Sequence, residues 1–228
     1  MKRNQSGFTL IEIAIVLVII GLLLGGILKG QELINSAKVK NLATDFKNIP
    51  VFIYGYQDKF RALPGDDKQV TTHLTNATLA TTPASSQGNG VIDGAWNSAT
   101  ATDETVLFWQ HVRLAGLAPG ETVVNVAVGN TYMPTNAVAG PIGITNSGTN
   151  NPITQPVATA LKGSYIVCSD NIPGKFAKQL DITLDDGNTA TGSLQVTVAG
   201  TASGGMSIPT SGPTGIVDDT PYLVCMGF

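Results

Sequence analysis

Residues 7–28 read GFTLIEIAIVLVIIGLLLGGIL, a nearly uninterrupted apolar run. From Phe8 onward it has 21 residues with a single charge, Glu12, and as a helix it would span about 30 Å, the thickness of a hydrocarbon core. Lys2 and Arg3 precede it and favour a cytoplasmic start. A secretory signal peptide fits poorly, because its apolar core would be shorter and would end in a small-residue cleavage site. We therefore predict a single membrane-spanning helix.

The rest of the 228-residue chain has a different composition. Only 13% of all residues are charged, about half the share usual in a soluble domain, and the chain contains 26 Gly and 12 Pro. This composition excludes a highly charged disordered chain. Residues 69–228 hold four basic and ten acidic residues, a net charge of −6, so no specific nucleic-acid partner is expected.

Glu12 is the exception within the apolar run. A carboxylate well inside a membrane costs about 2.5–3.5 kcal/mol on insertion scales, so such an acid usually has a partner or a function. Glu12 lies only four residues after Phe8, near the expected interface, where it could instead extend to water. Both interpretations follow from the physics alone.

The string GFTLIE, residues 7–12, behind a short basic leader and before a long apolar run, resembles the prepilin signal of type IV pilins and type II secretion pseudopilins. The resemblance implies that a prepilin peptidase removes residues 1–7 by cutting between Gly7 and Phe8, and methylates the new amine of Phe8. It also implies that Glu12 meets the N-terminal amine of a neighbouring subunit during assembly. Opposite charges that meet at low dielectric recover much of their desolvation cost.

The apolar period continues beyond the predicted span (residues 8–28) into an amphipathic half (residues 29–62), which should pack on the soluble domain. We predict one very long helix over about residues 8–62, with a kink favoured at Pro50 and an end before Pro64 and Gly65. In a filament we expect local melting within the glycine-rich residues 21–30. The apolar positions of the second half are Val39, Leu42, Phe46, Ile49, Ile53, Tyr56 and Phe60.

Residues 63–228 are predicted to form a globular head. After a polar loop over residues 66–100 we expect a short surface helix from Asp103, as capping residue, to Ala115, with Leu107, Phe108 and Val112 facing inward. Several strands after one very long helix predict an α+β fold, the pilin fold, with an antiparallel β-sheet head and short additional helices. Expected strands are 122–128, 164–168, 193–199 and 222–226, and a further helix is expected over 176–185.

Cys168 and Cys225 are the only cysteines. If the membrane-spanning helix begins on the cytoplasmic side, both cysteines lie outside the cytosol, where thiols oxidise. A disulfide is therefore expected, and two buried thiols are the alternative. A C-terminal cysteine pair also resembles the bridge that pins the terminal region of type IV pilins.

Motifs for catalysis are missing from the sequence: it has no phosphate-binding loop, zinc-ligand cluster or nucleophile elbow. The two histidines, His73 and His111, are expected on the surface or in packing, so we predict that the chain is not an enzyme.

Calcium is the one cofactor that the sequence suggests. GNGVIDG, residues 88–94, resembles part of a calcium loop, with Asn89 and Asp93 as ligands and Asp66 and Asp67 in the same polar region. A glycine-rich turn without metal is the alternative. We predict turns at residues 185–188 and at 218–219.

By resemblance, the expected function is a structural subunit of a type IV pilus. The precursor would be held in the bacterial inner membrane with a cytoplasmic N-terminus, and identical subunits would polymerise through the N-terminal helix at an inner-membrane assembly platform into an extracellular pilus. The long head and the cysteine pair resemble pilins more than major pseudopilins. Alternatives are a periplasmic type II secretion pseudopilin and a minor or adhesive pilin with a calcium-stabilised head. From other classes, a calcium-dependent binding module and a simple single-span anchored protein remain.

Overall fold

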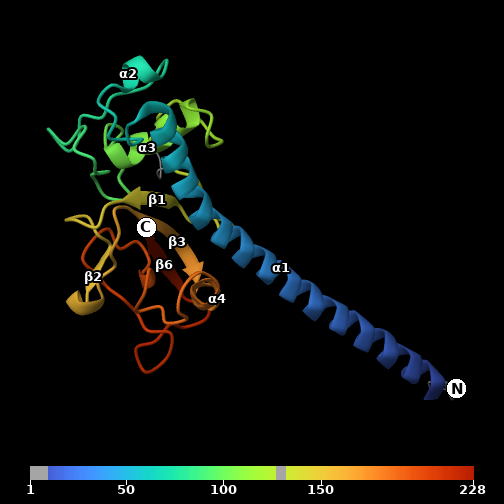
Figure 1. The fold of residues 1–228 in the computed structure, drawn as a ribbon. Coiled ribbons are helices and arrows are strands. Elements are labelled where there is room, and N and C mark those ends of the chain that lie inside the picture. Colours follow the sequence, from blue (N-terminus) through green and yellow to red (C-terminus); the bar gives the residue numbers. More distant parts are fainter. Residues whose placement is uncertain (1–9, 127–131) are drawn as a thin grey trace, which may run out of the picture. The chain divides into compact units, whose positions relative to one another are not determined.

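The computed structural model describes residues 10–126 and 132–228. Helix α1 (Leu10–Phe60) covers 51 residues and confirms the very long N-terminal helix (Figure 1). The chain forms two compact units, residues 1–38 and residues 39–228, and α1 contributes to both. Each unit is described by itself below.

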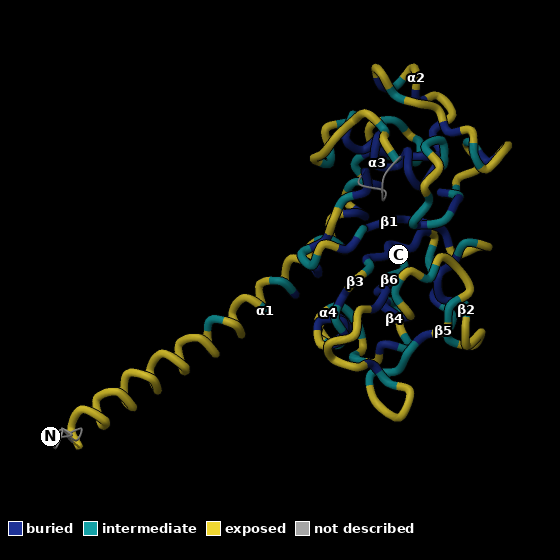
Figure 2. The backbone as a smooth tube through the Cα atoms, turned by 180° about the vertical axis from the view of Figure 1, so that it is seen from behind, coloured by how far each residue is buried: buried dark blue, intermediate teal, exposed yellow. Residues whose placement is uncertain are grey.

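The first unit is the N-terminal part of α1, and its apolar side chains face outward. No residue from Leu10 to Lys38 is buried, and the large aliphatic side chains from Leu10 to Ile34 are 47–88% exposed (Figure 2). The helix is long and apolar enough to cross a membrane. Water is an unfavourable surrounding for so much apolar surface, so lipid or protein has to cover it.

The second unit begins with the buried half of α1. The buried positions recur every three or four residues, which places them on one face of the helix, as predicted. Pro50 is among them, and the helix continues through it. The buried residues are Val39, Leu42, Ala43, Phe46, Ile49, Pro50, Ile53 and Tyr56.

The helix ends where a left-handed backbone begins. Arg61 has a φ of 57° and Gly65 a φ of 91°, on either side of Pro64. A Cβ atom on Gly65 would lie 2.4 Å from the backbone oxygen of Glu104, so only glycine fits this close approach. The turn predicted after Leu63 is confirmed.

The head contains a four-stranded antiparallel sheet in the order β1-β3-β6-β4. Its strands are β1 (Ile142–Thr145), β3 (Ile166–Pro173), β4 (Leu194–Val198) and β6 (Pro221–Gly227). A separate parallel pair joins β2 (Ile153–Gln155) to β5 (Gly205–Met206). The α+β fold with an antiparallel sheet is therefore confirmed.

Two predicted strands match closely, and two do not. The strands expected over 193–199 and 222–226 are β4 and β6, whereas the one expected over 164–168 begins at Ile166 and extends to Pro173. The strand expected over 122–128 is wrong for residues 122–126, which form no strand, and residues 127–128 lie outside the described ranges. Side chains of the preceding helix bind this backbone instead: Gln110 donates to the Thr122 carbonyl and Arg113 to the Glu121 carbonyl.

Helix α3 (Glu104–Leu114) was expected on the surface, which is wrong. Ten of its eleven residues are buried, including the predicted inward positions. Its polar side chains tolerate burial because neighbouring loops supply hydrogen-bond partners. Asp103 precedes the helix, but its side chain does not cap it; the carboxylate instead accepts hydrogen bonds from the hydroxyls of Thr82 and Ser98.

The remaining helices are short. Helix α4 (Gly174–Leu184) confirms the helix expected over 176–185. The polar segment over residues 66–100 is mostly irregular, as predicted, apart from the four-residue helix α2 (Val70–His73). A single 3₁₀ turn, Val157–Thr159, follows β2.

The sheet packs apolar side chains on both faces. Successive residues of a strand point to opposite faces, so Val167 and Val224 join the main core with α1, α3 and α4, while Cys168 and Cys225 join a second cluster. Trp96 belongs to the second cluster. The loops that carry Trp96 and β2 therefore cover the face of the sheet opposite the helices.

Candidate functional site

The predicted processing site, Gly7 and Phe8, lies outside the described residues. Glu12 is described: it lies in the first turn of α1 with an exposed side chain, inside the uncovered apolar surface. An acid in the first turn of a helix interacts favourably with the helix dipole. The structure thus displays Glu12 on the surface that needs covering, and its role in assembly stays a prediction.

Four glycines interrupt the same surface in two pairs. Gly21 and Gly25 are four residues apart, as are Gly26 and Gly30, so each pair shares a side of the helix. A Cβ atom on any of the four would meet nothing within 4 Å. No neighbour in the described part of the chain therefore requires glycine there, and these positions expose bare backbone for a close approach by another helix.

The disulfide between Cys168 and Cys225 is confirmed. The two residues face each other across β3 and β6, the inner strands of the sheet, with Cα atoms 4.1 Å apart and neither side chain exposed. The two cysteines are 57 positions apart in the sequence, and the segment between them includes α4 and β4. The disulfide links the two inner strands at a pair of directly opposed residues.

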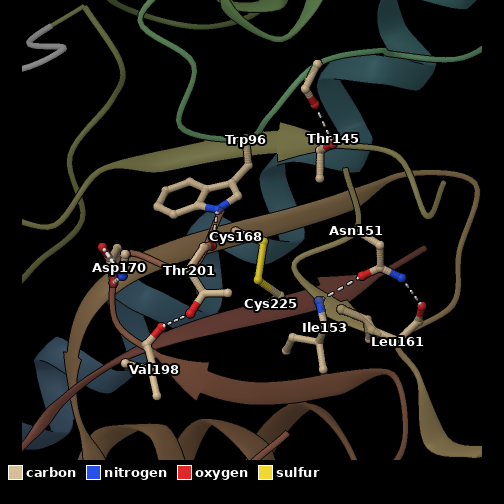
Figure 3. Close-up of a disulfide and its surroundings, with 12 residues drawn as sticks. Trp96, Thr145, Asn151, Ile153, Leu161, Cys168, Asp170, Val198, Thr201 and Cys225 are labelled. Atoms are coloured by element: carbon tan, nitrogen blue, oxygen red, sulfur yellow. Dashed lines mark hydrogen bonds between the residues drawn. A yellow bond between two sulfur atoms is a disulfide. The ribbon is translucent and has the colours of Figure 1, made fainter. Parts of the chain in front are cut away.

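Buried and partly buried polar contacts surround the disulfide (Figure 3). The Trp96 indole N–H donates to the Thr201 carbonyl over 2.8 Å, which fixes the 95–96 loop to the turn after β4. The Asn151 side chain donates to the Leu161 carbonyl and accepts from the Ile153 N–H, at 2.8 and 2.9 Å. These contacts satisfy backbone groups that would otherwise be buried without partners.

Asp66 and Asp67, two of the predicted calcium ligands, are buried and bind different groups. Asp66 accepts the backbone N–H groups of residues 88–90 and so holds the glycine-rich loop. Asp67 accepts the Tyr56 hydroxyl over 2.8 Å and lies 2.6 Å from His73 Nδ1. The structure therefore brings Asp66 to the predicted loop and directs Asp67 toward α1 and α2.

The other two predicted ligands contact each other. Asn89 Nδ2 donates to Asp93 over 2.8 Å, and the second oxygen of Asp93 accepts from the Asn146 amide, also over 2.8 Å. Each carboxylate oxygen of Asp66 and Asp93 already has an N–H donor, so these contacts alone account for the order of the loop. Calcium binding here stays a prediction.

The two histidines serve the packing of the head. His111 is fully buried, accepts the Gly65 N–H at Nδ1 and donates from Nε2 to the Thr78 carbonyl, at 2.9 Å each. Burial lowers the pKa of His111, opposed in part by the Thr78 carbonyl, so the ring is neutral. His73 stacks on Phe60 with ring centroids 5.2 Å apart. Sequence reasoning missed these contacts, because partners far apart in sequence carry no local signal.

One comparison with known proteins gives a match. The prokaryotic N-terminal methylation motif matches residues 2–28, a range that contains Gly7, Phe8 and Glu12. No curated protein and no solved structure matches the chain. The match thus concerns the N-terminal segment, and the head is interpreted from its own residues.

Proposed function

We propose that this chain is a structural subunit of a type IV pilus, because the N-terminal methylation motif supports the type IV pilin and pseudopilin family and the α+β fold with its very long first helix is consistent with it. The family is a structural group and not an enzymatic one. The motif implies processing by a prepilin peptidase and polymerisation into a filament. The N-terminal helix fits a membrane-anchored precursor.

The observation that carries the proposal is the methylation motif on an uncovered apolar helix. The aliphatic side chains from Leu10 to Ile34 need a surrounding other than water. In the precursor, the lipid of the inner membrane provides it, with the N-terminus in the cytoplasm. In the filament, identical helices of neighbouring subunits provide it. The same apolar surface thus contacts lipid in the precursor and neighbouring subunits in the filament.

Glu12 sets the register of this packing. Cleavage after Gly7 creates an amine on Phe8, and this amine of one subunit pairs with the Glu12 carboxylate of another. An unpaired charge in the apolar interior of the filament remains penalised, so helices that are out of register are disfavoured.

The exposed glycine pairs support close helix packing. Small residues four positions apart allow two helix backbones to approach each other, and Gly21–Gly25 and Gly26–Gly30 both have this spacing. The opposing effect is the low helix propensity of glycine, from which we expect melting within residues 21–30 once lipid is absent.

The head favours a pilus over a secretion pseudopilus by resemblance. Residues 63–228 form a long head, and the disulfide joins the C-terminal strand β6 to β3, as the bridge of type IV pilins pins their terminal region. Major pseudopilins are usually shorter and lack that bridge. We therefore assign an extracellular pilus, and a periplasmic pseudopilus is the competing outcome.

Filaments sheared from the cell surface test the assignment. Electron microscopy followed by mass spectrometry should show this chain as an abundant filament component that begins with N-methylated Phe8. A chain found only in periplasmic filaments would instead be a pseudopilin. A chain that retains residues 1–7 would be a simple membrane-anchored protein and would contradict the proposal.

The variant Glu12→Gln tests the register. It removes the charge at constant size, so membrane insertion and cleavage should persist. Because about 1.4 kcal/mol per contact already corresponds to a tenfold change in binding, filament yield should fall at least about tenfold. The matched control is Glu32→Gln, which removes an exposed acid of the same helix that pairs with Lys29 over 2.7 Å. Equal filament yield from the two variants would refute the role of Glu12.

A further inference from the structure

Three carboxylates meet where α4 ends. Asp181 lies in the last turn of α4, and Asp185 and Asp186 begin the loop that leads to β4. One oxygen from each of the three lies within 4.8 Å of the others. The C-terminal end of a helix carries partial negative charge, and the last turn of α4 has no basic residue. Local electrostatics therefore oppose this cluster.

Asp181 is the anomalous member. Its side chain is completely buried, and neither carboxylate oxygen has a hydrogen-bond partner. A carboxylate that is buried without partners is costly, and buried carboxylates normally pair with a cation or with donors. The pKa of Asp181 is raised to about 7, first by burial and then by Asp186 and Asp185, whereas the nearby Gly187 N–H opposes the shift without forming a hydrogen bond of ordinary geometry.

The two other carboxylates are held in place by the loop. Asp185 accepts the Ser193 hydroxyl over 3.1 Å and the Leu194 N–H over 2.8 Å. A Cβ atom on Gly192, which has a φ of 79°, would lie 2.0 Å from Asp185, so the loop closes tightly around this side chain.

Asp186 accepts the Asn188 N–H and the Thr191 hydroxyl, both over 2.8 Å. Each of these oxygens keeps a second lone pair, so the contacts orient the carboxylates and leave room for a further ligand.

We propose that Asp181, Asp185 and Asp186 bind a Ca²⁺ ion. Calcium binds oxygen at about 2.3–2.6 Å, so two ligands on opposite sides of the ion lie at most about 5 Å apart, which accommodates the observed cluster. The set contains only carboxylate oxygens, which select a hard cation over zinc or copper. Asp181 closes the site from inside, and Asp186 is exposed, so water can complete the six to eight ligands.

The ion would fasten the loop over residues 185–193 to the end of α4. This loop leads directly into β4. Strand β4 pairs with β6, and β6 also carries Cys225, which faces Cys168 of β3. The site lies elsewhere in the head from the glycine-rich loop over residues 88–94. Its existence does not depend on the proposed filament role, because it concerns only the stability of the head.

The test uses the full chain in detergent micelles, stripped of metal with a chelator. Thermal unfolding is followed with CaCl₂, with MgCl₂, and with NaCl at matched ionic strength. At a tenfold excess over the dissociation constant, Ca²⁺ should raise the melting temperature by about 3–6 °C, and calorimetry should give one ion per chain. No rise with Ca²⁺, or an equal rise with Mg²⁺, would overturn the calcium assignment.

Variants locate the ion. Asp181→Asn should abolish the calcium-dependent rise and should itself stabilise the metal-free protein, because it removes an unpartnered buried charge. Asp186→Asn, at the exposed ligand, should also lower calcium affinity, and it provides the test if the buried substitution fails to fold.

Two control variants should show the same calcium-dependent rise in melting temperature as the unaltered protein. Asp219→Asn removes an exposed acid that pairs with Lys175 over 3.0 Å, and Asp93→Asn alters the glycine-rich loop. Loss of the rise in Asp93→Asn alone would move the ion to the 88–94 loop and would refute the α4 site.

Discussion

Reduction of the disulfide should lower the stability of the head by about 4 kcal/mol. Cys168 and Cys225 are separated by 57 positions, and closing a loop of that length removes this much unfolded-state entropy at 25 °C in the chain-entropy model. For a unit of this size the loss corresponds to a melting temperature lower by about 8–16 °C. Oxidised and reduced protein differ by only two hydrogen atoms, so their comparison isolates the cross-link.

Urea unfolding with and without dithiothreitol measures this difference. Both tryptophans, Trp96 and Trp109, are buried in the head, so their fluorescence reports on the head and not on the N-terminal helix. Because neither sulfur is exposed, samples have to be unfolded in the reductant and then refolded. The double variant Cys168→Ala/Cys225→Ala should have the same free energy of unfolding with and without dithiothreitol. A difference below about 1 kcal/mol between oxidised and reduced protein would show that the bridge does not restrict the unfolded chain, contrary to this prediction.

Two further predictions concern the buried half of α1 and the polar start of α3. Leu42→Ala should destabilise the head by about 2–5 kcal/mol in urea unfolding, because Leu42 is completely buried in the main core; the control Val51→Ala, at a position 62% exposed on the same helix, should stay within about 0.5 kcal/mol. Burial raises the pKa of Glu104 to about 7, although the Ser86 hydroxyl and the Asp93 N–H lower it. Its folded-state pKa therefore exceeds the unfolded value, so its stabilising contribution is complete below about pH 4.5 and is lost as the pH rises through 7. Glu104→Gln should gain stability relative to the unaltered protein across this range, and a pH-independent difference would contradict the assignment.

Sequence reasoning succeeded where the pattern is local and periodic. The long helix follows from an apolar run and then a three-and-four spacing, and β4 and β6 follow from short apolar segments between turns. The disulfide followed from compartment chemistry and resemblance, and the structure adds that both cysteines lie at one rung of the inner strands.

The errors arise where distant residues decide the outcome. Residues 122–126 are rich in valine, which favours a strand, but side chains of α3 bind the backbone carbonyls of Glu121 and Thr122. The polar residues of α3 read as a solvent face, yet loops distant in sequence bury them. Asp185 and Asp186 read as part of a turn, and nothing in their immediate sequence indicates that Asp181, one helical turn earlier, is buried beside them without a partner.

The position of β6 has a consequence for the order of events during biogenesis. It follows the other strands in the chain but lies between β3 and β4, so these two strands cannot belong to one sheet until residues 221–227 have been synthesised. By then the apolar helix near the N-terminus has long been made. In the membrane-anchored precursor proposed above, the chain would therefore carry an open β3 edge while it is tethered, and tethering would keep such edges from reaching other chains by free diffusion. Completion of the head then coincides with arrival of the strand that brings Cys225 opposite Cys168.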